Sequence, residues 1–107
     1  MLNPRTRDPG FAEVMGKNIA RYREAMGVSQ EELGFIAGLH RTAVGQLERG
    51  ERVARADTVI RLCGSLGVEP NALYEGLGWR PAEFTKGELI VRLRELGAVD
   101  GPEPGGR

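Results

Sequence analysis

Apolar positions recur at helical intervals along most of the chain and predict a series of short helices. Within residues 11–26, Met15, Ile19 and Tyr22 stand at i, i+4 and i+7, which is the spacing of one face of an α-helix. Gly27 follows this segment and is expected to end it, because glycine adopts the left-handed backbone of a helix C-terminus at low cost. The first element is therefore expected to be a helix over residues 11–26.

Two further helices joined by a tight turn are predicted over residues 29–50. Ser29 is a hydroxyl N-cap, and Glu32 follows three residues later, which is the spacing of a capping box. Gly38 is expected to end the first of these helices. The apolar positions of this helix, expected to face inward, are Leu33, Ile36 and Ala37.

The second of these helices is predicted from about residue 40 to residue 49, with Val44 and Leu47 facing inward and Gly50 ending it. Its other side chains are polar, small or cationic, and no hydrophobic core needs them. They are Arg41, Thr42, Gly45, Gln46 and Arg49. A short helix held by its back face, with such side chains turned outward, is suited to the major groove of DNA.

The next two helices complete a small core. A helix over 57–66 is predicted with one of two inward stripes, either Ile60, Cys63 and Leu66 or Val59, Leu62 and Leu66. Cys63 is interpreted as a small buried hydrophobic residue. Pro70 opens a fifth helix at a permitted first-turn position, and Gly78 is expected to end it.

In these residues the chain resembles the lambda-repressor/Cro-like helix-turn-helix family, the XRE type of bacterial and phage regulators. The resemblance covers about residues 11–79. It is carried by the SQEEL opening at Ser29, the small Gly34, Gly38 and Leu39 in the turn, the LERG ending at 47–50 and the later segment LGVEPNALY. It implies an all-α fold, namely a five-helix lambda-repressor-like DNA-binding domain, and a transcriptional regulator, most simply a repressor.

Segments on either side of this domain, 1–10 and 80–107, are expected to be a loose arm and a C-terminal extension. Thr85 and Glu88 have capping-box spacing, and a sixth, amphipathic helix is predicted at about 86–97. Its apolar residues are Leu89, Ile90, Leu93 and Leu96. This face either docks back on the domain or pairs with another copy, and we favour a homodimer. The composition of the final GPEPGGR predicts a disordered end.

Contacts to bases are expected from the predicted reading helix. Arg41 carries a guanidinium fork that matches guanine O6 and N7, and Gln46 is suited to adenine. Thr42 offers a hydroxyl or a methyl contact. Gly45 departs from the family pattern, because related helices carry a side chain at this position and a possible contact is lost.

Contacts to phosphates are expected around this helix. The resemblance implies that Gln30 hydrogen-bonds the DNA backbone, with help from the helix dipole. Arg49 ends the helix near the backbone, and Arg52 and Arg55 in the following loop are candidate clamps, with solvated loop charges as the alternative. His40 either reaches a phosphate or is an exposed histidine.

The resemblance also implies one structural pair. An arginine at the position of Arg23 pairs in this family with a glutamate at the position of Glu48, which ties the first helix to the reading helix. The alternative is two separate exposed charges.

Charge and composition temper this reading. The 107 residues carry 15 Lys and Arg and 15 Asp and Glu, a formal net charge of zero, whereas DNA-binding proteins usually carry a basic footprint. The case for double-stranded DNA as a partner therefore rests on local clustering of arginines. The balance favours an alternative, in which the same fold serves a toxin–antitoxin pair or a protein-interaction adaptor.

Other classes of function find no motif in the sequence. One histidine and one cysteine give neither a metal-binding set nor a disulfide framework, so we expect no metal and no cofactor. No phosphate-binding loop follows a strand, and we expect no enzyme. The apolar runs are too short for a membrane span, and the cytoplasm is the expected compartment.

Overall fold

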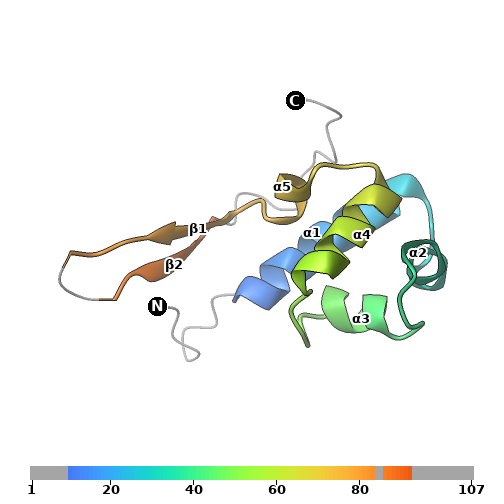
Figure 1. Ribbon diagram of the computed structural model, residues 1–107, viewed down its shortest axis with the longest axis horizontal. Coiled ribbons are helices and arrows are strands. Elements are labelled where there is room, and N and C mark those ends of the chain that lie inside the picture. Colours follow the sequence, from blue (N-terminus) through green and yellow to red (C-terminus); the bar gives the residue numbers. More distant parts are fainter. Residues whose placement is uncertain (1–9, 84–85, 93–107) are drawn as a thin grey trace.

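The computed structural model describes residues 10–83 and 86–92, which form a helical body and a projecting β-hairpin (Figure 1). The helices are α1 (Phe11–Met26), α2 (Gln30–Ala37), α3 (Ala43–Glu48), α4 (Ala56–Leu66) and α5 (Pro70–Leu73). The hairpin is formed by β1 (Leu77–Arg80) and β2 (Glu88–Val91), paired antiparallel. Five helices follow the expected order, but the hairpin departs from the expected all-α fold. Within these ranges no helix is both long enough and apolar enough to cross a bilayer.

Local capping residues define the ends of the first two helices. α1 ends at Gly27, whose φ of 82° lies in the left-handed region. The Ser29 Oγ atom accepts a hydrogen bond from the Glu32 amide at 3.0 Å, and Glu32 Oε1 accepts one from the Ser29 amide at 2.7 Å. α2 ends at Gly38, with φ 72°. These boundaries and the capping box confirm the sequence prediction.

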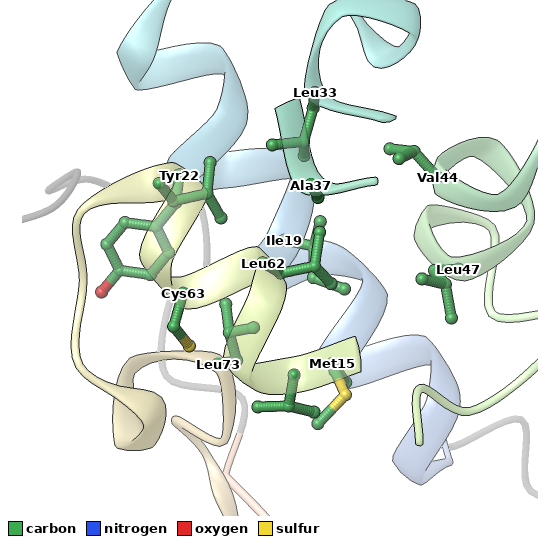
Figure 2. Packing of buried hydrophobic residues seen from close by; sticks show 12 residues of the cluster. Met15, Ile19, Tyr22, Leu33, Ala37, Val44, Leu47, Leu62, Cys63 and Leu73 are labelled. Atoms are coloured by element: carbon green, nitrogen blue, oxygen red, sulfur yellow. The ribbon is translucent and has the colours of Figure 1, made fainter. Parts of the chain in front are cut away.

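A single hydrophobic core lies between the helices (Figure 2). The predicted stripe of α1, made up of Met15, Ile19 and Tyr22, is buried in it. On α4 the second of the two predicted stripes is the buried one, together with the Cys63 side chain, whereas Ile60 is 60% exposed. Burial raises the pKa of the Cys63 thiol, so this side chain stays protonated and packs as a hydrophobic residue.

The inward face of α2 differs from the prediction at one position. Ile36 is 51% exposed, and the buried residues of this helix are Leu33, Gly34 and Ala37. The reason is that α2 packs against α3 and α4 through the side that carries Gly34, which turns Ile36 toward solvent. Its neighbour Phe35 is 88% exposed.

α3 and α5 are shorter than the sequence predicts. α3 begins at Ala43, because the amide of Ala43 bonds the carbonyl of His40 at 2.9 Å in a tight turn and regular helix starts only after Thr42. α5 ends at Leu73, and Gly76, with φ 86°, turns the chain into β1. The predicted end at Gly78 is therefore wrong, since Gly78 lies inside a strand.

The predicted sixth helix at about 86–97 is wrong where the structure describes it, because Glu88–Val91 is the strand β2. A run of three apolar residues, two of them β-branched, suits a pleated strand once a partner strand is available. β1 provides that partner, with Leu77 opposite Val91 and Trp79 opposite Leu89. Leu93, Leu96, the rest of that predicted helix and the arm at 1–9 lie outside the described residues.

A buried amide joins the helical body to the root of the hairpin. Asn18 of α1 is fully buried, and its Nδ2 atom donates to the carbonyls of Leu73 at 2.9 Å and Glu75 at 3.0 Å. These carbonyls lie at the end of α5 and in the turn that precedes β1. The amide satisfies two backbone acceptors there and fixes the point from which the hairpin leaves the body.

Gly16 allows α1 and α3 to approach closely. A Cβ atom at this position would lie 2.3 Å from the carbonyl oxygen of Leu47 and 2.7 Å from that of Glu48. Neither carbonyl belongs to a flexible side chain, so any larger residue would push the two helices apart. The position of α3 on the body therefore depends on this glycine, which the sequence reading does not single out.

We predict that Gly16→Ala destabilises the fold by about 1–3 kcal/mol, because the added methyl group overpacks the α1–α3 contact. The matched control is Gly64→Ala on α4, where a Cβ atom meets nothing within 4 Å. This control should stabilise the protein by about 0.5–1 kcal/mol through helix propensity. Chemical denaturation of both variants measures the difference, and equal effects would contradict the role assigned to Gly16.

Candidate nucleic-acid interface

The helices α2 and α3 form a rigid unit because their back faces are anchored in the core. Leu33 of α2 and Val44 of α3 are fully buried, and Leu47 is 3% exposed. Gly50, with φ 74°, ends the unit directly over α1, where a Cβ atom would lie 2.7 Å from Glu13 Cγ. The outward side chains of α3 thus project from a backbone that is held on its opposite side.

A buried carboxylate connects three helices behind this surface. The Glu48 side chain is 6% exposed and accepts hydrogen bonds from Arg23 Nε at 2.6 Å and Arg23 Nη2 at 3.1 Å. Its Oε1 atom also accepts from Gln30 Nε2 at 2.8 Å. Arg23 donates in addition to the carbonyl of Val28 at 2.9 Å. The pair implied by the family resemblance is thus brought together, and the hydrogen bonds to Glu48 raise the pKa of Arg23.

Gln30 has a role that the sequence reading misses. Its amide, expected on a phosphate, donates in this structure to Glu48 and so links the start of α2 to the end of α3. The side chain is exposed, so its carbonyl oxygen and second amide hydrogen remain on the surface. The sequence shows a glutamine two residues before the capping-box glutamate, but it does not indicate the bond to Glu48, which lies 18 residues away.

The three residues expected to contact bases lie on one surface. Arg41 and Thr42 are exposed in the turn before α3, and Gln46 is half-buried one helical turn later. The Thr42 hydroxyl lies 3.1 Å from His40 Nδ1. Within residues 10–83 and 86–92 the Arg41 guanidinium has no hydrogen bond or ion pair, which leaves its fork available to an external acceptor.

The space beside Gly45 is filled by Arg49. A Cβ atom on Gly45 would lie 3.0 Å from Arg49 Nη1 and 3.3 Å from Gln30 Oε1. The guanidinium of Arg49 therefore lies across the outer face of α3 rather than beyond its end. The lost side chain at Gly45 makes room for a cation beside Gln30, and this compensation is not visible in the sequence.

The remaining candidate cations already have partners on the surface. Arg49 donates through Nε and Nη2 to the Glu51 carboxylate at 2.7 and 3.2 Å, which lowers the pKa of Glu51. Arg52 donates to Gln46 Oε1 at 3.1 Å. Arg55 lies 3.3 Å from an oxygen of Asp57. All three arginines are exposed, so these contacts can be exchanged for an external anion.

A helix-turn-helix family model matches residues 19–73, which includes α2, the turn, α3 and α4. This chain belongs to the helix-turn-helix family. The matched range ends at Leu73, so the hairpin of this helix-turn-helix protein lies outside it.

Individual relatives agree with this assignment. The control protein C.SmaI of Serratia marcescens is 43% identical over 54 residues, which is 50% of this chain and 64%, just under two thirds, of that protein. The crystal structure of the restriction-modification controller protein C.AhdI from Aeromonas hydrophila superposes with a TM-score of 0.57 at 37% identity, covering 58% of this chain and 94% of C.AhdI. The P22 c2 repressor, solved in complex with a synthetic operator, gives a TM-score of 0.55 at 29% identity over 58% of this chain and 94% of its own.

We predict that Glu48→Gln destabilises this helix-turn-helix protein by about 1.5–3 kcal/mol, because Arg23 then loses the carboxylate that compensates its buried charge. Glu24→Gln is the matched control, since Glu24 is also an acid beside Arg23, 3.6 Å from Nη2, but its side chain is 69% exposed. Its effect should stay below about 0.5 kcal/mol. Thermal and urea unfolding report both values. Similar losses in the two variants would show that burial of Glu48 does not decide the effect.

Proposed function

We propose that this helix-turn-helix protein is a transcriptional regulator that binds double-stranded DNA as a homodimer and represses a promoter. The observation that carries the proposal is the surface around α3. It combines the Arg41 guanidinium, which has no partner among the described residues, with exchangeable polar groups on a helix that is anchored in the core on its opposite side. Membership of the helix-turn-helix family supports the proposal, as does the similarity to the P22 c2 repressor and to the control protein C.SmaI.

In the proposed complex the Arg41 fork donates to O6 and N7 of a guanine in the major groove. Gln46 pairs with an adenine, which requires its Oε1 atom to leave Arg52 and accept from the base. Arg52 is then released toward a phosphate, so one exchange supplies both a base contact and a backbone contact. The Thr42 hydroxyl, next to His40, adds a third contact at the start of the helix.

Phosphate contacts in the proposal surround this base-reading group. Gln30 and Arg49 lie side by side at Gly45 and would contact the phosphates of one DNA strand. His40 lies at the opposite end of the α3 surface. Arg52 and Arg55 address the backbone beyond α3. Two copies place their α3 helices in successive major grooves, about 34 Å apart, because one copy of this size provides few base contacts. As a regulator of the bacterial type, the protein would act in the cytoplasm.

A second function is favoured by a different surface. Phe35 is 88% exposed and its neighbour Ile36 is 51% exposed, so the outer side of α2 presents an apolar pair to solvent. With a formal net charge of zero, this feature fits a protein-interaction adaptor or a toxin–antitoxin component. Absence of DNA binding by the unmodified protein would favour this reading, and retained binding by the α3 variant described next would remove α3 as the reading helix.

The double variant Arg41→Ala, Gln46→Ala should lose at least about 30-fold in affinity for duplexes selected from a random pool, because each base pair contact contributes about 1–3 kcal/mol of discrimination. Gel-shift titration measures the loss. The matched control Lys17→Ala, Asn71→Ala likewise removes one cation and one carboxamide, from exposed positions on α1 and α5, and should bind as the unmodified protein does.

Glu51→Gln should raise affinity for duplex DNA of any sequence several-fold, because Arg49 no longer has to leave a carboxylate to reach a phosphate. The slope of log affinity against log salt should steepen by up to about 0.9, the value for one added phosphate contact. Fluorescence anisotropy across a salt series measures both. Glu83→Gln removes an exposed acid elsewhere and should change neither the affinity nor the slope. An equal gain in affinity in both variants would show that net charge alone is responsible.

A further inference from the structure

In the described part of the chain no third strand pairs with the β-hairpin, and the hairpin lies outside the family match. The sheet contains only β1 and β2 among the described residues, and Figure 1 shows it extending away from the helical body. A two-stranded ribbon in water is marginally stable by itself, and its free peptide groups are ready to pair with another strand. The hairpin is therefore the part of the molecule best suited to contact another chain.

One face of the hairpin is apolar. Residues directly opposite each other share a face, and the pairs Leu77–Val91 and Trp79–Leu89 fall on the same one. Trp79 is 61% exposed, and its indole lies over Gly87, where a Cβ atom would be 2.6 Å from the ring. The helical body leaves the outer part of this face in solvent.

The edge of β2 is the better of the two for pairing. The amide of Arg92 bonds the carbonyl of Gly76, so by alternation the peptide groups of Leu89 and Val91 point away from β1. No backbone hydrogen bond joins them to a third element in the described part of the chain. β1, in contrast, is followed directly by Pro81, which has no amide hydrogen.

We propose that β2 pairs antiparallel with β2 of a second copy of this chain, about a two-fold axis at Ile90. In this register Leu89 lies opposite Val91 of the second copy, so the outward peptide groups of both strands meet. Glu88 lies opposite Arg92 of the second copy, and the two charges attract. The inference deepens the homodimer of the proposed function and rests on that part of it.

The symmetric register centred on Leu89 is less favourable. Pairing centred on Leu89 places Lys86 opposite Arg92 of the second copy, which repel. A slip of one residue turns the apolar face of one hairpin to the opposite side of the sheet. With the axis at Ile90, the four apolar residues of each hairpin form one continuous stripe across four strands. Glu88, which already contacts Arg80, then lies between two guanidinium groups.

The test reverses one charge at a time and then mixes the variants. In Arg92→Glu, both Glu88–Arg92 contacts of the dimer become repulsive, and in Glu88→Arg they become repulsive with the opposite sign. A heterodimer of the two variants restores attraction at both contacts. Sedimentation should give the unmodified protein a mass about twice 11.7 kDa, each variant a dimer dissociation constant at least ten-fold weaker, and the equimolar mixture a constant near the original.

The outcomes separate this inference from the rest of the proposal. Glu83→Arg, which reverses an acid outside both strands and keeps Glu88 and Arg92, is the control and should dimerise as the unmodified protein does. A dimer that ignores the charge reversals, or a mixture that stays monomeric, overturns the hairpin register but leaves the homodimer. A monomeric unmodified protein overturns both, whereas DNA binding by the α3 surface is measured separately by gel shift.

A second variant keeps the inference testable if charge reversal disturbs the hairpin. Ile90→Cys places two thiols at a non-hydrogen-bonded pair, where Cα atoms about 4.5 Å apart permit a disulfide. Mild oxidation should give a covalent dimer, while Val53→Cys, which is exposed on the loop before α4, should give little. Cys63 is buried and does not interfere. Equal cross-linking of the two variants, or none at Ile90→Cys, overturns the proposal.

Discussion

The carboxylate of Glu48 is the contact on which the arrangement of α1, α2 and α3 depends. It lies almost out of solvent and receives donors from Arg23 on α1 and Gln30 on α2. A buried carboxylate is tolerated only with such partners, so separating any of the three helices would leave a buried charge without compensation. Because Glu48 is the last residue of α3, the same contact that satisfies its charge also sets the direction in which that helix faces solvent.

Gly16 complements this electrostatic contact with a steric one. The backbone of α3 approaches α1 so closely that only a hydrogen atom fits between them. The ion pair requires a short distance between the helices, and the glycine permits it. Together they explain how a helix of six residues, too short to be stable alone, keeps a defined position.

Local signals in the sequence predicted local structure correctly. Ser29, Glu32 and Gly38 determine the ends of α2 through contacts within a few residues, and no distant part of the chain is needed to interpret them. The sequence wrongly predicts a helix at β2 because Thr85 and Glu88 have the spacing of a capping box, while the partner strand β1 begins 11 residues before Glu88. Gly16 and the Gln30–Glu48 bond could not be predicted for the same reason, since each depends on a contact between separate elements. The fit of Arg49 over Gly45 is a matter of side-chain packing, in which Gln30 of α2 also takes part.

The buried Asn18 amide has a consequence for how two copies would read DNA. It joins the root of the hairpin to α1, and α1 in turn holds α3, so no flexible linker separates the strand edge from α3. If copies associate through the hairpin, the separation and tilt of their reading helices are inherited from the monomer's architecture. Such a dimer would then tolerate few inserted or deleted base pairs at the centre of an operator, because the DNA and not the protein would have to deform.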